Sequence, residues 1–207
     1  MDLSVWLAFL SASIVLALAP GPDNLFVLAQ SALYGVKAGL LVVLGLCSGL
    51  IIQTICAACG LAAVIAAIPA LFFAIKLVGA LYLCYLAFMA WTHARDPITN
   101  SKTEAKTGFK LWRRGFIMNI TNPKVQIFFL AFFPQFVAKG TEGFALVLQM
   151  LLQGLTFIFA TAVVFTGIAY GAGFLSAQVS NASFRFYLNR LSAILFLGLA
   201  LFTLFLA

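Results

Sequence analysis

Six long apolar stretches, almost free of charge, constrain the fold of this chain more than any other feature. Crossing about 30 Å of hydrocarbon takes about 20 helical residues. Stretches of at least that length occur at 3–33, 38–68, 70–91, 115–137, 144–175 and 184–206. Charged residues make up only 8% of the 207 residues, against about 25% in soluble domains, so the chain has too little polar surface to face water on all sides. We therefore predict an all-α integral membrane protein with six transmembrane helices.

Two of these stretches are interrupted by proline next to a charge. The motifs are Pro20-Gly21-Pro22-Asp23-Asn24 in the first stretch and Asn122-Pro123-Lys124 in the fourth. As one straight helix, residues 3–33 would run about 46 Å, which is too long for one upright crossing. Proline lacks the N–H that continues a helical ladder. We therefore predict that the first and fourth helices are broken at Pro20, Gly21 and Pro22 and at Pro123.

Both breaks fit the same local pattern of cap, proline and charge. Asn122 is a good N-cap, Pro123 fits the first helical position, and Lys124 then stands second. In the first break the same pattern makes Gly21 the cap and puts Asp23 second. The helix dipole favours an acid in the first turn and disfavours a lysine. We therefore expect Lys124 to face an anion, which is either Asp23 or the carboxylate of a ligand.

A single acid and a single base at membrane depth are costly and mark a transport pathway. Broken helices are the usual construction of substrate sites in secondary transporters. Asp23 and Lys124 match the ammonium and the carboxylate of one zwitterion, and no second acid lies deep in an apolar stretch to receive a cationic side chain. The sequence thus favours neutral amino acids as substrates, with protons as the coupling partner at Asp23. We expect Asn24, Asn119 and Asn122 to take part in binding.

A structural interpretation of the two charges is the alternative. Lys124 could extend to the membrane surface, and Asp23 could cap its helix and pair with the lysine. A permanent buried ion pair is, however, an expensive way to stabilise a break. We expect no metal site and no cofactor, because His93 has no partner histidine or cysteine nearby in the sequence.

The positive charges are distributed unevenly between the two sides of the predicted membrane. Nine bases fall on the side of the central loop, and two, Lys76 and Lys139, on the other. The nine are Lys37, Arg95, Lys102, Lys106, Lys110, Arg113, Arg114, Arg185 and Arg190. This asymmetry predicts a cytoplasmic central loop, at 93–113, and both termini outside. It accounts for the net charge of +7 without nucleic-acid binding, since no aromatic residues interleave the bases in a groove.

The two halves of the chain resemble each other in outline. Splitting a single transporter domain of residues 1–207 at the central loop leaves three crossings in each half, at about 1–92 and 114–207. An odd number turns the second half upside down, so we predict two inverted three-helix repeats. The middle helix of each half carries a small-xxx-small pair, Gly45 with Gly49 and Gly167 with Gly171, which predicts close helix packing. A homo-oligomer is compatible with this arrangement.

Two further segments of the sequence allow other interpretations. Cys56 and Cys59 match C-x-x-C, which would suit a membrane thiol-redox carrier, but their apolar flanks favour packing. The N-terminus has no basic region, and its Ala17-Leu18-Ala19 is followed at once by Pro20, which suits cleavage poorly. We expect the first helix to stay in the protein.

At the two proline motifs the chain resembles the lysine exporter/homoserine-threonine exporter (LysE/RhtB) family of bacterial amino-acid exporters. The resemblance rests on Pro20-Gly21-Pro22-Asp23, on Asn119 with Asn122-Pro123-Lys124, and on Phe133-Pro134-Gln135-Phe136. It implies a transporter rather than an enzyme, exporting amino acids across the inner membrane at the expense of the proton motive force. The motifs do not separate neutral from basic substrates, so exporters of basic amino acids remain an alternative, as do the cation exporters of the same superfamily.

Overall fold

The computed structural model describes residues 2–67, 69–94, 108–138 and 140–205, and these residues are almost entirely helical. The first half contains α1 (Leu3–Leu18), α2 (Pro22–Tyr34), α3 (Val36–Ala67) and α4 (Pro69–Thr92). The second half contains α5 (Gly108–Thr121), α6 (Pro123–Ile127), the π-helix η1 (Phe128–Phe132), the 3₁₀-helix η2 (Phe133–Phe136), α7 (Gly143–Tyr170), α8 (Ala172–Ser180) and α9 (Ala182–Phe205).

The structure confirms six spans in an all-α membrane protein, two of them broken. Parts of α3 and α4, and the whole of α7 and α9, are each long and apolar enough to cross a membrane. The other two spans are bent pairs: α1 meets α2 at 61°, and α5 meets the segment Pro123–Phe136 at 50°. The chain is therefore a multi-pass membrane protein, and its two bends lie at the predicted proline motifs.

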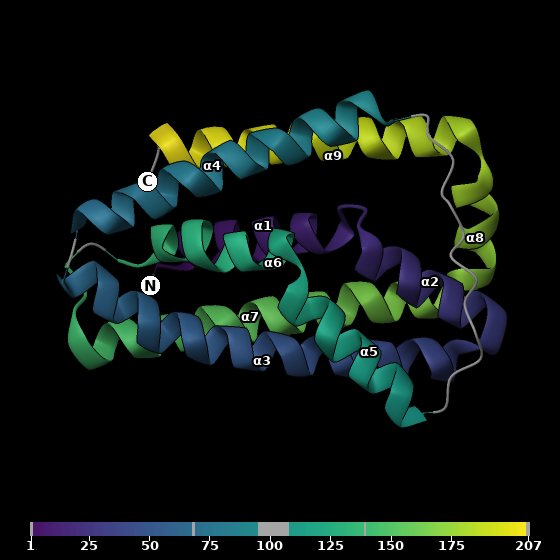
Figure 1. The fold of residues 1–207 in the computed structure, drawn as a ribbon, viewed down its shortest axis with the longest axis horizontal. Helices are drawn as coiled ribbons and strands as arrows, with labels where there is room; N and C mark the ends of the chain where they lie inside the picture. Colours follow the sequence, from purple (N-terminus) through teal and green to yellow (C-terminus); the bar gives the residue numbers. More distant parts are fainter. Residues whose placement is uncertain (1, 68, 95–107, 139, 206–207) are drawn as a thin grey trace.

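The broken spans occupy the middle of the molecule. Figure 1 shows α3 beside α7 along one side and α4 beside α9 along the other, with α1 and the α6 segment between these pairs. In this arrangement α1 packs on α7, and η1 packs on α4. Each outer pair combines corresponding helices of the two halves, as an inverted repeat would, although the repeat itself remains a prediction.

Two helices begin earlier than the predicted spans. The predicted loop 93–113 ends earlier because α5 already begins at Gly108, which puts Lys110 and Arg113 on a helix. The rest of that loop, 95–107, lies outside the described residues, as does Lys139. The interval between the predicted spans 144–175 and 184–206 is occupied by α8 and by an early start of α9, where the Asn181 side chain accepts hydrogen bonds from the N–H groups of Ser183 and Phe184.

One end of the molecule collects most of the described bases. Figure 1 shows that the α2–α3 turn, α8 and the beginnings of α5 and α9 share one end, while the two termini share the other. The bases on these elements are Lys37, Lys110, Arg113, Arg114, Arg185 and Arg190. We call this the basic end. Helix α8 runs across it, roughly at right angles to the spans (Figure 1), and no predicted element corresponds to α8.

Glycines bring the backbones of α3 and α5 into direct contact. A Cβ at Gly45 would collide with the carbonyl oxygen of Trp112, and a Cβ at Gly115 would collide with that of Val42. A Cβ at Gly49 would come within 2.7 Å of Asn119 Oδ1. Such close approach without side chains is the usual role of small residues between membrane helices. The contact fixes α5, and hence the second break, against α3.

The second small-xxx-small pair differs from the prediction. A Cβ at Gly167 would meet no atom within 4 Å, and the atoms nearest to one at Gly171 belong to Gly167 at the end of α7 and Leu175 of α8. Gly171 instead stands at the corner between α7 and α8. The close contact of α7 is made by Gly154, whose absent side chain leaves room for Thr54 of α3. The motif alone could not show which face of the helix meets a neighbour.

A cluster of phenylalanine rings packs beside the breaks. Phe9 of α1 lies 5.2 Å from Phe133 and 5.3 Å from Phe136, centroid to centroid, and Phe128 lies 5.0 Å from Phe132. All five rings are at most 4% exposed. We call these five residues the phenylalanine cluster. It joins α1 to η1 and η2 on the side of the breaks that leads toward the termini (Figure 1).

The two glycine environments make a matched test of the packing. Gly45→Ala would force α3 and α5 apart, and overpacking of this kind costs about 1–3 kcal/mol. Gly167→Ala enters open space and removes a flexible glycine from a helix, so it should stabilise the protein by about 0.5–1 kcal/mol. The measurement is the melting temperature of each variant in detergent. Equal shifts for the two variants would contradict the proposed α3–α5 contact.

Candidate functional site

The first break leaves several carbonyl groups of α1 without helical donors. The helix ends at Leu18, and Pro20 and Pro22 have no N–H to continue the ladder. Side chains supply the missing donors. The Asn24 amide donates to the carbonyl of Ala17 at 2.7 Å, and the Lys124 ammonium donates to those of Leu16 at 3.3 Å and Ala19 at 3.0 Å. The predicted site residues thus complete the broken end of α1.

Lys124 reaches this position from the first turn of α6. Asn122 caps α6, and its side-chain oxygen accepts from the N–H of Lys124 at 3.0 Å, with Pro123 at the predicted first position. The lysine therefore stands at the positive end of its own helix. Its ammonium lies at the carbonyl end of α1, where the dipole favours a cation. Lys124 is only 8% exposed, so the charge is held inside the protein.

Asn122 also joins the two breaks. Its amide nitrogen donates to Asp23 Oδ2 at 2.6 Å, and Asp23 occupies the first turn of α2 after the cap residue Gly21. Asp23 is 4% exposed. A single asparagine therefore caps one half-helix and binds the carboxylate at the start of the other.

The second carboxylate oxygen of Asp23 is available for a ligand. Asp23 Oδ1 is buried and accepts no hydrogen bond from the described residues. Asp23 and Lys124 interact electrostatically, but the lysine donates to backbone carbonyls and not to the carboxylate. The expectation that Lys124 faces an anion is therefore met only at a distance. An unpartnered carboxylate oxygen inside a membrane protein is costly and marks a place for a proton or a cation.

The second break is completed in the same way as the first. The Gln53 amide of α3 donates to both the carbonyl and the side-chain oxygen of Asn119, at 3.0 Å and 2.9 Å. The Gln126 amide donates to the carbonyl of Ile120 at 2.6 Å. Asn119 is 2% exposed, and the hydrogen bonds from Gln53 tie it to α3 as well as to its own helix α5.

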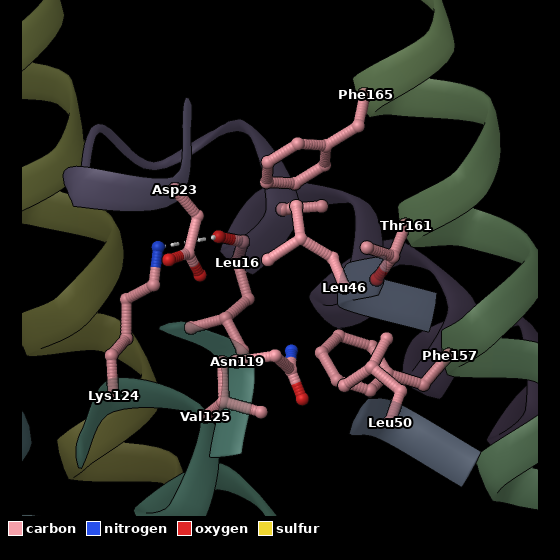
Figure 2. A pocket seen from close by; sticks show the side chains of 11 residues that line it. Leu16, Asp23, Leu46, Leu50, Asn119, Lys124, Val125, Phe157, Thr161 and Phe165 are labelled. Atoms are coloured by element: carbon pink, nitrogen blue, oxygen red, sulfur yellow. Dashed lines mark hydrogen bonds between the residues drawn. The ribbon is translucent and has the colours of Figure 1, made fainter. Parts of the chain in front are cut away.

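A small cavity lies between the breaks and the helices α3 and α7. Its space for water-sized molecules is about 20 Å³, enough for a water molecule but not for an amino acid. Figure 2 shows Asp23 and Lys124 at one side of it and apolar side chains at the other. Its lining comprises Leu16, Ala17, Asp23, Leu46, Leu50, Asn119, Lys124, Val125, Phe157, Thr161 and Phe165. The cavity is thus charged at one side and apolar at the other.

The structure brings together most of the predicted binding residues and adds several that the sequence did not single out. Asp23, Lys124 and Asn119 line the cavity, while Asn24 and Asn122 hold the two breaks around it. The added residues come from α3 and α7: Leu46, Leu50, Phe157, Thr161 and Phe165. Apolar residues of a membrane helix carry no signal that separates a cavity wall from a lipid-facing surface, and only the hydroxyl of Thr161 could have drawn attention.

The other candidate chemistry lies away from this cavity. Cys56 and Cys59 are both exposed on the outer surface of α3, and all four cysteines are free. Within the described ranges, no group of three or more histidine, cysteine, aspartate or glutamate residues could hold a metal ion.

Comparison with known proteins gives the family. The chain is 31% identical over 202 residues to the leucine efflux protein of Salmonella typhimurium, which covers 96% of this chain and 93% of that protein. It is 29% identical over 197 residues to the homoserine/homoserine lactone efflux protein of the same organism, which covers 95% and 94%. No solved structure matches the chain. The family model described as "LysE type translocator" matches residues 14–206, and the chain therefore belongs to this family.

Proposed function

We propose that this protein is a secondary transporter that exports neutral amino acids from the cytoplasm in exchange for protons. The observation that carries the proposal is the pair of buried opposite charges at the two helix breaks. Asp23 offers an unpartnered oxygen, and Lys124 offers a cation, at one small cavity. A zwitterion needs both groups, and a site with only one acid and one base holds one zwitterion.

Each charge would bind a different group of the substrate. The ammonium group of the amino acid would bind Asp23 Oδ1, while Oδ2 keeps its hydrogen bond from Asn122. The carboxylate of the amino acid would draw Lys124 away from the carbonyls of Leu16 and Ala19. A charge-assisted bond to a carboxylate is stronger than one to a neutral carbonyl, so this exchange is favourable.

Competition at Asp23 supplies the coupling to protons. One carboxylate oxygen can take a proton or an ammonium group but not both. A proton entering from outside would therefore displace the substrate, and a substrate entering from the cytoplasm would displace the proton. Because a charge at membrane depth is costly without a partner, the empty and unprotonated site is disfavoured during the transition. This rule makes the transporter an exchanger.

The wall of the cavity favours neutral and apolar side chains. Leu46, Leu50, Phe157 and Phe165 form the side away from the charges, and Thr161 is the polar residue among them. The relatives named as leucine and homoserine efflux proteins agree with this substrate class. The cavity must widen to admit any amino acid, which fits alternating access with α2 and α6 moving relative to α3 and α7.

The membrane orientation follows from the bases. From the positive-inside rule we infer that the basic end faces the cytoplasm and both termini lie outside, and we propose the inner membrane of a bacterium as the location. Export then means movement from the basic end toward the end that carries the termini.

Two other cargoes fit the site less well. A lysine or arginine substrate would need a second anion or an aromatic face for its side chain, and the wall contributes Phe157 and Phe165 only as apolar rings. A divalent cation prefers six or more oxygen ligands, whereas here a lysine stands beside one carboxylate.

Removing the charge of Asp23 tests the coupling. Asp23→Asn keeps an oxygen that can accept from Asn122, so the variant should still fold, which its melting temperature in detergent checks. It should lose proton-driven leucine transport, measured in proteoliposomes with an imposed pH gradient. Asp2→Asn, at the exposed N-terminus, is the matched control and should transport normally. Full proton-coupled transport by the Asp23→Asn variant would contradict the assignment of Asp23 as the coupling group.

The substrate class is tested by competition. Uptake of radiolabelled leucine into proteoliposomes should be inhibited by unlabelled leucine, threonine or homoserine and left unchanged by lysine, arginine or divalent cations. Equal inhibition by lysine and leucine would instead indicate a basic-amino-acid exporter. Growth of cells loaded with mixed dipeptides, with the free amino acids outside measured, gives the unbiased version of the same test.

A thiol mechanism makes the opposite prediction from ours for the cysteines. Cys56 and Cys59 lie on the outer surface of α3, away from the cavity. Replacing both with alanine should leave leucine transport within experimental error of the parent protein. Loss of transport, with normal expression and melting temperature, would favour the redox carrier.

A further inference from the structure

Helix α2 carries buried polar groups beyond Asp23 that the proposed site does not use. Gln30 is 0% exposed, and neither atom of its amide has a hydrogen-bond partner among the described residues. The hydroxyl of Ser31, 6% exposed, also lacks one. A leucine or alanine would fill these positions at lower cost, because an unpaired polar group in a dry interior is unfavourable.

The spacing of these groups follows the helix axis away from the cavity. Gln30 stands seven residues after Asp23, and Ser31 stands seven after Asn24. Seven residues are about two turns, or about 10 Å, so each pair lies on one face of the helix. Two polar rows therefore run from the break toward the α2–α3 turn at the basic end (Figure 1).

Small residues pack tightly against α2 at the level of Ser31. A Cβ at Gly39 of α3 would overlap the hydroxyl of Ser31 and would lie 3.2 Å from the Cβ of Ala169 in α7. Three helices therefore meet through a hydroxymethyl group, a hydrogen atom and a methyl group. Such a contact leaves no space between the helices, and because it has no interlocking side chains the helices can separate with little rearrangement.

Both ends of α2 provide points of rotation. At one end, the break between Leu18 and Pro22 bends the chain by 61°. At the other, Gly35 has a φ of 85°, in the region that favours glycine, and the next helix begins at Val36. The 13-residue helix can therefore move as a rigid piece between two flexible joints.

We propose that the face of α2 with Gln30 and Ser31 lines the inner leg of the substrate pathway, closed here by the contact of Ser31, Gly39 and Ala169. The proposal rests on the proposed function, which supplies the site at Asp23. Movement of α2 away from α3 and α7 hydrates Gln30 and Ser31 and connects the cavity to the basic end. The amide and hydroxyl then bind the polar groups of the passing amino acid and its water.

Thiol labelling tests the route without any knowledge of the substrate. Ser31→Cys is made in a variant lacking the four native cysteines and treated with a membrane-impermeant charged maleimide. Everted vesicles, which expose the cytoplasmic face, should be labelled about tenfold or more faster than right-side-out vesicles, because the proposed route opens Ser31 to that face. Ser192→Cys, equally buried in α9, is the control and should stay protected on both faces. Equal labelling from both faces, or none in either, overturns the proposal.

Gln30→Leu separates transport from stability. Without the unpaired amide the variant should melt a few degrees higher, and it should transport leucine about tenfold more slowly because the open route loses a polar contact. Thr203→Val, which removes a buried hydroxyl on α9, should leave the transport rate unchanged. Full leucine transport by Gln30→Leu overturns the proposed route while the exporter function stands. Conversely, one-sided labelling of Ser31→Cys in a protein that moves no leucine would keep the route and reject the cargo.

Discussion

One side chain, the amide of Asn122, holds the two interrupted spans in register. Its oxygen caps α6 by accepting from the N–H of Lys124, and its nitrogen donates to the carboxylate of Asp23 at the start of α2. The positions of both buried charges depend on this amide. A lysine two residues after the same cap, and an acid two residues after Gly21, thereby meet at one cavity although 101 positions separate them in the chain. Any motion that parts α2 from α6 must exchange this bond for another.

The interrupted end of α1 explains why the Lys124 ammonium is needed even without a ligand. Pro20 removes the donor that the carbonyl of Leu16 would otherwise have, and the helix ends before Ala19, so Lys124 donates to both carbonyls. The same ammonium is the group that a substrate carboxylate would recruit. In the proposed mechanism, binding at the cavity would therefore remove donors from the end of α1 and so affect the joint between α1 and α2. At the second break the corresponding donors are the neutral amides of Gln53 and Gln126.

Much of this architecture could be predicted from the sequence because its causes are local. At each break a proline without an N–H, a capping residue before it (Gly21 or Asn122) and a charge after it determine the local structure. The six spans follow from apolar length alone. The wall residues Leu46 and Phe157 could not be predicted, since nothing in a uniformly apolar helix marks its inner face. For the same reason the pair Gly45 and Gly49 meets α5 closely, whereas at the pair of identical spacing Gly167 faces open space and Gly171 faces Leu175 of the adjoining helix α8. Helix α8 was missed because its short, mixed sequence carries no membrane-length signal.

The phenylalanine cluster has a bioenergetic consequence. Five rings packed at most 4% exposed, with Phe9 from α1 against η1 and η2, offer no hydrogen-bonding group along which protons could hop. A proton-coupled exporter, as proposed here, must not let protons cross the membrane when it is not exchanging substrate. The phenylalanine cluster, on the side of the termini, would block proton leakage in the closed protein. Protons could then enter only when its rings separate.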